Sequence, residues 1–425
     1  MVVSYVGCMA KPTNQSEWQL LRAEVFDSFT PGKHIKEMSM FAGRRDVVQR
    51  LQDVAQEEGR NAIIFGEKGV GKTSLAEVFH KGLNVIDAQS GVQKRSVVAI
   101  HVNADTKDSF DSLWRKVFRR INRPNSSLTV DLDYTGPIEP DHVVLELDRF
   151  TPNQMPIIVI DEYDRIEEVD CRILVTDLIK ALTLCRNNPT IVLVGIAENI
   201  MQLVHDHSSI AGRNLVQVHM KRMSRPELRQ IVTTRLRRIG MEITEDALWR
   251  VEYFSAGLPA YAHSLGKFAA FQAIKRQRIT IDEGMVLEAT HDCMSDVDYT
   301  IVEAYSRATE RIYRKDNLFR EVLAACALAE TNDLGQFTAA SIELPLSALR
   351  GEPMKVPSFA FHLNEMSGPA RGNVLQKSGA RRTFKYQFTE AAMQPYVVMK
   401  SLADEVIKSD VMDRFRISRQ RSLSI

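Results

Sequence analysis

The chain has 425 residues, of which 44% are hydrophobic and 26% are charged, so it is long enough for two or three globular domains, each with its own core. Lys and Arg together number 55 and Asp and Glu 54, which gives a net charge of +1. This balance excludes a general electrostatic attraction to nucleic acid or membrane, and any DNA contact must be local.

The five cysteines are scattered and never spaced as CxxC, which argues against a disulfide framework or a zinc site and favours the cytoplasm. The apolar start MVVSYVGCMA lacks a preceding basic segment, and no later stretch offers eighteen uncharged apolar residues. We therefore expect a cytoplasmic protein with neither a secretory signal nor a membrane span.

After an N-terminal extension, residues 1–39, strand-like runs alternate with helical patterns. Continuously apolar strands between helices indicate a parallel sheet that is covered on both faces, so we predict one α/β domain over residues 40–222. Residues 122–140, rich in Pro, Ser, Asn and Asp, predict a surface insertion. The expected helices cover 41–60, 108–121, 141–150 and 169–187, and the expected strands cover 61–65, 96–104, 155–164 and 190–198.

Helical spacing without strand signals follows the predicted sheet domain, and residues 223–316 are expected to form a helical lid with linker helices. Residues 317–405 combine a helix, two short helical stretches and two strand-like runs around Ser378-Gly379. This is the order of a helix-turn-helix followed by a wing, so a winged-helix domain is predicted. Residues 406–425 are expected to form a basic, disordered tail.

The segment GEKGVGKTS has the pattern G-x-x-x-x-G-K-[ST], between the apolar run NAIIF and a helix-like segment. Such glycines let backbone N–H groups point at the β-phosphate, the lysine reaches β and γ oxygens, and the threonine offers its hydroxyl to Mg²⁺. A simple glycine-rich turn is the alternative. We predict that nine consecutive residues bind a nucleotide: Gly66, Glu67, Lys68, Gly69, Val70, Gly71, Lys72, Thr73 and Ser74.

The run IIVIDEYD places two carboxylates at the end of a predicted strand. Asp161 would hold Mg²⁺ through water, together with the Thr73 hydroxyl. Glu162 follows directly and would orient or deprotonate the attacking water. The alternative is that both carboxylates merely cap a buried strand. The predicted cofactors are therefore ATP and Mg²⁺.

A catalytic Glu beside the aspartate, with an extra strand between the phosphate loop and that pair, resembles the branch of P-loop enzymes that includes the AAA+ and STAND ATPases. The block FAGRRD resembles the h-h-G-R-x-x-E signature ahead of the phosphate loop in STAND ATPases and is similar to the entry of initiator-type AAA+ proteins. Asp46 stands where Glu is usual. The resemblance implies a three-layer α/β P-loop NTPase fold and adds Gly43 and Arg44 to the nucleotide site.

Two further segments resemble ATPase elements of these families. TIVLVGIAEN is similar to the sensor-1 strand of origin-recognition initiators, where a polar residue reads the γ-phosphate; here that residue is Asn199 or Glu198. HSSIAGRNLVQVHM resembles the segment in which an arginine reaches a neighbouring subunit's site, and Arg213 matches it. This implies a homo-oligomer whose assembly controls hydrolysis. A surface arginine at a strand start is the alternative.

The lid segment SAGLPAYAH carries Gly257-Leu258-Pro259, which resembles the GxP motif of STAND ATPases, whose proline lies against the adenine. Initiators usually carry a sensor-2 arginine early in the last lid helix, and this chain departs from that pattern. The γ-phosphate is then sensed less directly within the subunit. A proline at the first helical position after a glycine turn is also a sufficient interpretation.

The predicted recognition helix, residues 357–367, contains no Lys or Arg, although major-groove helices normally supply some. The predicted wing is richer in cations, with Phe384 and Tyr386 interleaved, and could follow a DNA backbone. A solvated basic hairpin is the alternative. The predicted DNA contacts are Arg371, Lys377, Arg381, Arg382 and Lys385.

Together these features predict an ATP-hydrolysing AAA+/STAND-type switch or machine that couples its nucleotide state to oligomer assembly and to an effector protein or DNA. One hypothesis is an oligomeric loader that depends on Arg213, and a second is a STAND switch that rests with ADP bound. A third, from another class, is a DNA-binding regulator in which the nucleotide only sets the conformation.

Overall fold

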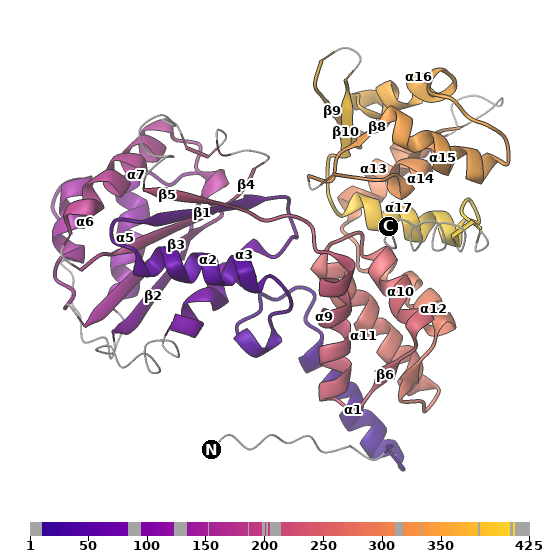
Figure 1. Ribbon diagram of the computed structural model, residues 1–425, viewed down its shortest axis with the longest axis horizontal. Helices are drawn as coiled ribbons and strands as arrows, with labels where there is room; N and C mark the ends of the chain where they lie inside the picture. Colours follow the sequence, from indigo (N-terminus) through magenta and orange to yellow (C-terminus); the bar gives the residue numbers. More distant parts are fainter. Residues whose placement is uncertain are drawn as a thin grey trace. The chain divides into compact units, whose positions relative to one another are not determined.

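The computed structural model describes residues 11–83, 95–122, 134–151, 153–185, 187–197, 200, 203–204, 214–310, 318–332, 334–380, 383–408 and 411–412. The chain forms two compact units, one of residues 33–221 and the other of residues 1–32 with 222–425 (Figure 1). The chain therefore crosses between the units twice, first after Gly32 and again after Lys221.

A five-stranded parallel sheet forms the centre of the first unit, in the order β2-β3-β4-β1-β5. The predicted parallel α/β sheet is thereby confirmed. In the sequence β2 lies between β1 and β3, but in the sheet it is an edge strand and β4 separates the other two. The strands are β1 (Asn61–Gly66), β2 (Ser96–Asn103), β3 (Gln154–Asp161), β4 (Thr190–Ile196) and β5 (Leu215–His219).

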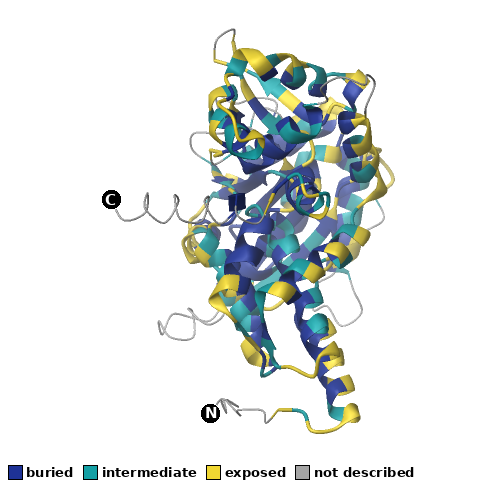
Figure 2. Cartoon of the chain, turned by 90° about the vertical axis from the view of Figure 1, so that its right-hand side faces the viewer, coloured by how far each residue is buried: buried dark blue, intermediate teal, exposed yellow. Residues whose placement is uncertain are grey.

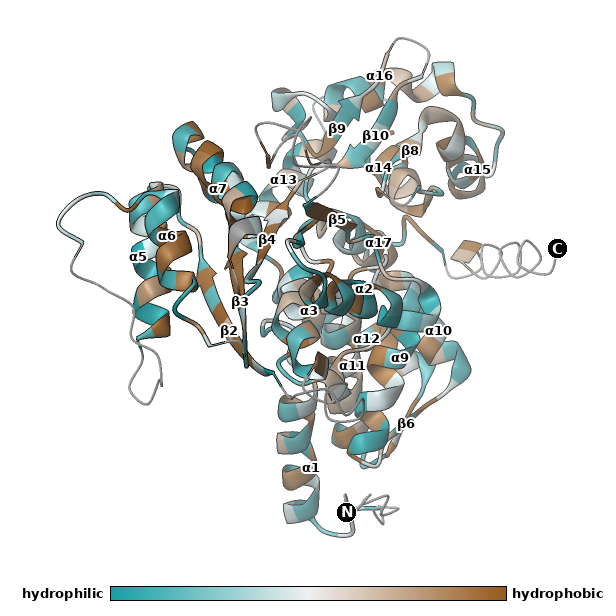
Figure 3. Cartoon of the chain, turned by 60° about the vertical axis from the view of Figure 1, so that its left-hand side comes forward, coloured by the Kyte–Doolittle hydropathy of each residue, from teal (hydrophilic) through white to brown (hydrophobic). Residues whose placement is uncertain are grey.

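Helices cover both faces of this sheet (Figure 3). On one face the side chains of three helices and the sheet share a continuous apolar core. These helices are α5 (Phe110–Ile121), α6 (Pro140–Leu147) and α7 (Val169–Ala181). On the other side lie α2 (Arg45–Gln56) and α3 (Lys72–Val78). The sheet with its two helical layers is the three-layer arrangement that the resemblance implied.

Two helix boundaries differ from the prediction. The helix expected over 41–60 begins only at Arg45, because Gly43 and Arg44 adopt positive φ angles of 67° and 53° that no α-helix accepts. The helix expected to reach residue 187 ends at Ala181 and continues as a short 3₁₀ turn. Part of the predicted surface insertion, residues 123–133, lies outside the described residues.

The predicted lid, in the second unit, contains α9 (Arg225–Arg238), α10 (Glu245–Phe254), α11 (Pro259–Lys275) and α12 (Glu283–Ser295). The side chains of Thr244 and Asp282 accept N-cap hydrogen bonds at the starts of α10 and α12. The sequence predicted no strand here, but β6 (Glu242–Ile243) and β7 (Thr280–Ile281) pair in parallel. Strands of two residues carry no periodic signal that sequence reasoning can detect.

Helix α1 (Gln15–Ser28), in the predicted N-terminal extension, belongs to the same unit as the lid and packs on α11 and α9. One face of α1 is buried through Trp18, Leu21 and Val25, and the opposite face is exposed (Figure 2). Phe29 is also buried, and a Cβ at Gly266 would lie 2.5 Å from its ring. The predicted extension thus contains a helix that packs on two helices of the predicted lid.

The C-terminal part of the second unit combines helices with a three-stranded antiparallel sheet in the order β8-β10-β9. The predicted hairpin turns at Gly379, where φ is 90° and a Cβ would lie 2.9 Å from the carbonyl oxygen of Thr383. None of the helices in the described chain is long and apolar enough to cross a membrane. The elements are α13 (Tyr299–Thr309), α14 (Phe319–Leu328), β8 (Phe337–Thr338), α15 (Ala339–Arg350), α16 (Val356–Met366), β9 (Leu375–Ser378), β10 (Lys385–Phe388) and α17 (Met393–Ala403).

Candidate active site

The phosphate loop joins the end of β1 to the start of α3, and its glycines are required by the backbone. Gly66 has a φ of 148°, and a Cβ there would collide with the carbonyl oxygen of Met220. Gly69 and Gly71 have φ angles of 86° and 96°. Glycine adopts these angles without strain, so the sequence closes the chain into a tight loop ahead of a helix N-terminus.

Lys72, the first residue of α3, is buried against the loop that precedes it. Its Nζ donates to the carbonyl oxygens of Gly66 at 3.0 Å and Glu67 at 2.7 Å. Burial lowers the pKa of Lys72 to about 8, against the charges of Asp164 and Asp161, which favour the ammonium form. The ammonium group therefore lies at the loop with two carboxylates near enough to influence its charge.

The two hydroxyl residues that follow have different surroundings. Ser74 Oγ accepts a hydrogen bond of 3.1 Å from the N–H of Ile35, in the segment that leads into the first unit. Thr73 is half-buried in the first turn of α3, directly after Lys72. Ser74 thus has a structural partner in the N-terminal segment, whereas metal binding by Thr73 stays a prediction.

Asp161 and Glu162 stand at the carboxyl end of β3, but they point differently. Asp161 is buried, and its Oδ1 accepts the N–H of Glu162 at 2.8 Å. Glu162 has a φ of 55°, and its half-exposed carboxylate pairs with Arg165 Nη1 at 2.9 Å. The sharp turn at Glu162 therefore separates a buried carboxylate from one that faces solvent.

The oxygen donors of Asp161 and Thr73 suit Mg²⁺, which prefers hard ligands and keeps several waters. Within the described chain, no group of three His, Cys, Asp or Glu residues could hold a metal ion by itself. A Mg²⁺ site made of one carboxylate, one hydroxyl, water and nucleotide phosphate requires no such group. The residues present therefore fit that cofactor.

Asp164 is a third carboxylate at this edge, which sequence reasoning missed. Its Oδ1 accepts the N–H of Ile196, at the end of β4, at 2.8 Å. A Cβ at Gly195 would lie 3.1 Å from the same oxygen, so glycine leaves room for the contact. Asp164 thus fixes the turn after Asp161 to the neighbouring strand, and its charge is the strongest that opposes the lowered pKa of Lys72.

Arg44, predicted to contact the nucleotide, makes hydrogen bonds to the protein backbone. Its buried guanidinium donates to the carbonyl oxygens of Val70 at 2.6 Å and Lys221 at 2.5 Å. Gly43 provides the turn before it through a φ of 67°. Arg44 therefore supports the phosphate loop and links it to the segment after β5, and its contact with the nucleotide stays a prediction.

The remaining predicted site residues fall into two groups. Glu198, Asn199 and Arg213 lie outside the described residues, so their roles stay predictions. Pro259 belongs to the second unit, where it starts α11 after Gly257, whose φ is 80°. The helix start predicted for Pro259 is confirmed, and its contact with adenine stays a prediction.

The predicted wing cations are not equivalent. Arg371 lies before the hairpin and is buried, with its guanidinium 3.8 Å from the ring centroid of Phe319, and Nη1 donates to the carbonyl of Glu310 at 2.7 Å. Its assignment as a DNA contact is therefore wrong, because folding already uses its charged group.

The two lysines of the hairpin are more accessible. Lys377 lies over Phe384 at 3.8 Å and is partly exposed, and Lys385 is exposed. Arg381 and Arg382 lie outside the described residues.

Residues 54–203 match the AAA domain family. Among solved structures, the ORC2 protein of Aeropyrum pernix in ADPNP-ADP complexes is 16% identical, with coverage of 92% of this chain and 98% of its own, and a TM-score of 0.52. The ORC1 protein of the same organism, in complex with DNA, is 16% identical with coverages of 88% and 94% and a TM-score of 0.46. The Thermotoga maritima RuvB Holliday junction branch migration motor is 15% identical, with coverages of 84% and 95% and a TM-score of 0.44. No curated protein sequence matches this chain.

Proposed function

We propose that this chain is a P-loop ATPase of the AAA type, which binds ATP with Mg²⁺ at residues 66–74 and acts as a switch. Hydrolysis would change the angle of the lid, and the C-terminal part would pass that change to an effector protein. The single observation that carries the proposal is the buried ammonium group of Lys72, whose Nζ donates to the carbonyl oxygens of Gly66 and Glu67 in the glycine loop at the end of β1.

Each residue of the site has a distinct task in this proposal. The loop N–H groups and Lys72 would hold the β- and γ-phosphates, while Thr73 and Asp161 would hold Mg²⁺. Bound Mg²⁺ supplies positive charge that neutralises the phosphate oxygens during transfer. Glu162 would orient and deprotonate water once it leaves Arg165. That ion pair is half-exposed and therefore weak, so its release costs little.

The variant Glu162→Gln tests this assignment because it keeps the size of the side chain and removes the base. We expect bound ATP to be retained and phosphate release to fall by about 100-fold or more. Arg165→Ala is the matched control and should hydrolyse ATP within about threefold of the wild type. Phosphate release and the nucleotide content of the purified protein measure both effects. Wild-type turnover in Glu162→Gln would remove Glu162 from the mechanism.

Homo-oligomer formation is proposed on the resemblance at Arg213. If Arg213 completes a neighbour's site, turnover per subunit rises with protein concentration, and Arg213→Ala binds ATP without hydrolysing it. A resting ADP-bound switch is the competing form of the same function, supported by the GLP segment and Pro259. Purified protein that carries stoichiometric ADP and stays monomeric with ATP would favour the resting switch over the oligomer.

A winged helix is proposed for the C-terminal part, on the order α14, β8, α15, α16 and the β9–β10 hairpin. Helix α16 contains no Lys or Arg, and Phe361 on it is 63% exposed. An exposed aromatic ring without cations suits a protein partner better than a DNA groove. A DNA-binding regulator acting through the hairpin, with Lys377 and Lys385, is the second candidate.

A further inference from the structure

The chain segment after β5 is held to the phosphate loop as far as Lys221. The N–H of Met220 donates to the carbonyl oxygen of Phe65, the residue before Gly66, at 2.7 Å. Arg44 binds the carbonyl oxygens of both Lys221 and Val70. The loop backbone and Lys221 are therefore joined by hydrogen bonds within the first unit.

The next residues are bound within the second unit. The N–H of Met223 donates to the carbonyl oxygen of Gly257 at 2.8 Å. Gly257 has a φ of 80°, and a Cβ there would lie 2.7 Å from Cβ of Arg222. Only glycine at position 257 therefore allows the lid turn to pack this closely against Arg222. The contacts change from those of the first unit to those of the second between Lys221 and Arg222, at the second chain crossing. We call the bond between Lys221 and Arg222, where the chain enters the second unit, the hinge.

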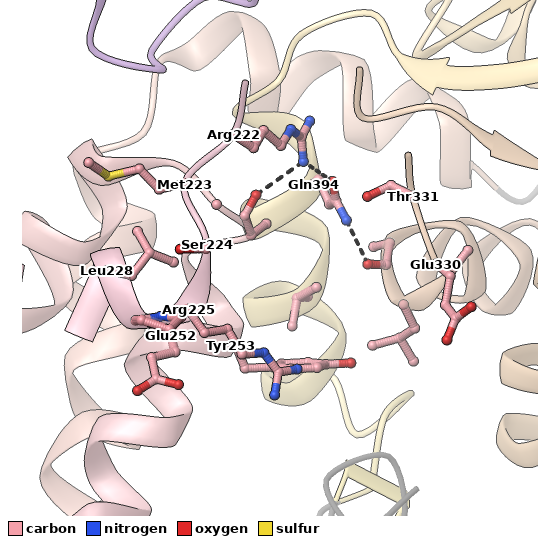
Figure 4. Close-up of a pocket in the computed structure, with 17 residues that line it drawn as sticks. Arg222, Met223, Ser224, Arg225, Leu228, Glu252, Tyr253, Glu330, Thr331 and Gln394 are labelled. Atoms are coloured by element: carbon pink, nitrogen blue, oxygen red, sulfur yellow. Dashed lines mark hydrogen bonds between the residues drawn. The ribbon is translucent and has the colours of Figure 1, made fainter. Parts of the chain in front are cut away.

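The side chain of Arg222 connects the hinge to two parts of the second unit. Its Nη1 donates to the carbonyl oxygen of Ala256, in the lid turn, at 3.1 Å, and to Oε1 of Gln394 on α17 (Figure 4). Gln394 is buried, and its Nε2 donates to the carbonyl oxygen of Ala327 on α14 at 2.9 Å. The guanidinium of Arg222 thus binds both the lid turn and α17, and the side-chain amide of Gln394 continues this chain of hydrogen bonds to α14.

A cavity of about 590 Å³ borders this link, with Tyr253, Glu330, Thr331 and Gln394 among its lining residues (Figure 4). Close packing is therefore interrupted beside Arg222, and hydrogen bonds fix the lid turn to α17 at this place. The lid and the C-terminal part are also joined elsewhere: Tyr261 Oη donates to the carbonyl oxygen of Ala392 at 3.1 Å, Arg250 Nη1 donates to Sδ of Met412 at 3.9 Å, and α17 packs on α10 and α12. Among these contacts, the hydrogen bond from Arg222 to Gln394 starts at the residue where the chain enters the second unit.

We propose that Arg222 is a positioning residue that carries hinge movement from the phosphate loop to α17 and α14, so that the C-terminal part moves with the lid turn. The proposal rests on the nucleotide switch proposed above and names the side chain that transmits it. Without the Arg222–Gln394 link, the lid should still respond to nucleotide, but the response of the C-terminal part should fall strongly.

Hydrogen–deuterium exchange of the full chain, with and without ADP and Mg²⁺, tests the link. In the wild type, nucleotide should change amide exchange in both α11 (259–275) and α17 (393–403). In Arg222→Ala, we expect the change in α17 to fall to about a third or less, with the change in α11 and the nucleotide Kd within about twofold of wild type. Gln394→Leu should give the same pattern, and the double variant should lose no more.

Two variants separate the link from a general loss of packing. Gln394→Glu keeps an acceptor for Arg222 and should keep the α17 response, although it cannot donate to Ala327. Arg225→Ala removes an arginine that lines the same cavity and should respond as the wild type does. If Arg222→Ala does not fold, Gln394→Leu serves as the test on its own.

The possible failures can be told apart. A wild-type response of α17 in Arg222→Ala or in Gln394→Leu would overturn the proposal. The proposal would also be overturned if the wild-type protein hydrolyses ATP but nucleotide changes amide exchange in neither α11 nor α17. In that case the ATPase assignment would stand. A wild type that binds no nucleotide would overturn the proposed switch, and with it the relay.

Discussion

The guanidinium of Arg44 donates to the carbonyl oxygen of Val70 at 2.6 Å, so a side chain outside the phosphate loop fixes the backbone at the centre of that loop. The same group binds Lys221, one residue before the hinge. The loop that the nucleotide would occupy and the segment that leads to the lid are thus joined by one buried charge.

Replacing Arg44 with Ala should disorganise the phosphate loop. Two backbone carbonyls lose a charged donor and a buried side chain leaves a cavity, so we expect the free energy of unfolding to fall by about 3 kcal/mol. ADP affinity should fall by about tenfold or more, because the loop N–H groups are no longer preorganised. Urea unfolding and titration with a fluorescent ADP analogue measure the two effects.

The neighbouring Arg45 is exposed and supplies the control. Arg45→Ala should change the free energy of unfolding by less than about 0.5 kcal/mol and leave ADP affinity unchanged. Equal affinity of Arg44→Ala and Arg45→Ala for ADP would mean that the loop keeps its shape without Arg44.

The ammonium of Lys72 should make nucleotide affinity depend on pH. Its pKa is about 8, and it should rise when phosphate oxygens surround the ammonium group. Below pH 8 the Lys72 side chain already carries its proton. Above pH 8 it is mostly neutral, so nucleotide binding must be accompanied by uptake of a proton. ADP affinity is therefore expected to fall by up to about tenfold per pH unit above pH 8. Calorimetric titration measures this slope, and Lys72→Met, which binds more weakly at every pH, should show none.

His80 should make stability depend on pH in the acidic range. Its ring centroid lies 5.5 Å from that of His101 on β2, and its Nε2 is buried without a hydrogen-bond partner among the described residues. Burial first, and then the charge of His101, lower the pKa of His80 to about 4. In the unfolded chain the His pKa is about 6.5, so on acidification the unfolded chain takes up the proton at a higher pH than the folded protein does. The free energy of unfolding therefore falls as the pH is lowered from about 6.5 toward 4.

The size of that loss can be measured by unfolding at several pH values. His80 should contribute about 2–3 kcal/mol to the fall in the free energy of unfolding between about pH 7 and pH 4. His80→Asn should remove that contribution, whereas the exposed His291→Asn should not. An identical pH dependence in His80→Asn and the wild type would show that His80 already titrates normally in the folded protein.

The phosphate loop and the parallel sheet could be predicted because their signals are local: a glycine pattern, and strands that are apolar along their whole length. The role of Arg44 could not, because its partners Val70 and Lys221 are 26 and 177 residues away in the sequence. Asp164 was missed for the same reason, since its partner is the end of another strand. Arg371 was misassigned because sequence shows charge but not burial.

Substitutions at the two lysines of the β9–β10 hairpin test whether the C-terminal part binds DNA or an effector protein. Arg371→Ala should lower the free energy of unfolding by about 2–3 kcal/mol through its lost contacts with Phe319 and Glu310, and leave duplex binding by the folded protein unchanged. If DNA binds the hairpin, Lys377→Ala and Lys385→Ala should each weaken duplex binding and reduce the salt dependence by about one phosphate contact. Fluorescence anisotropy at several salt concentrations measures both. If the variant without both lysines binds the duplex with the same salt dependence as the wild type, the hairpin is not the DNA site. If the wild type binds no duplex at low salt, the effector protein remains as the partner.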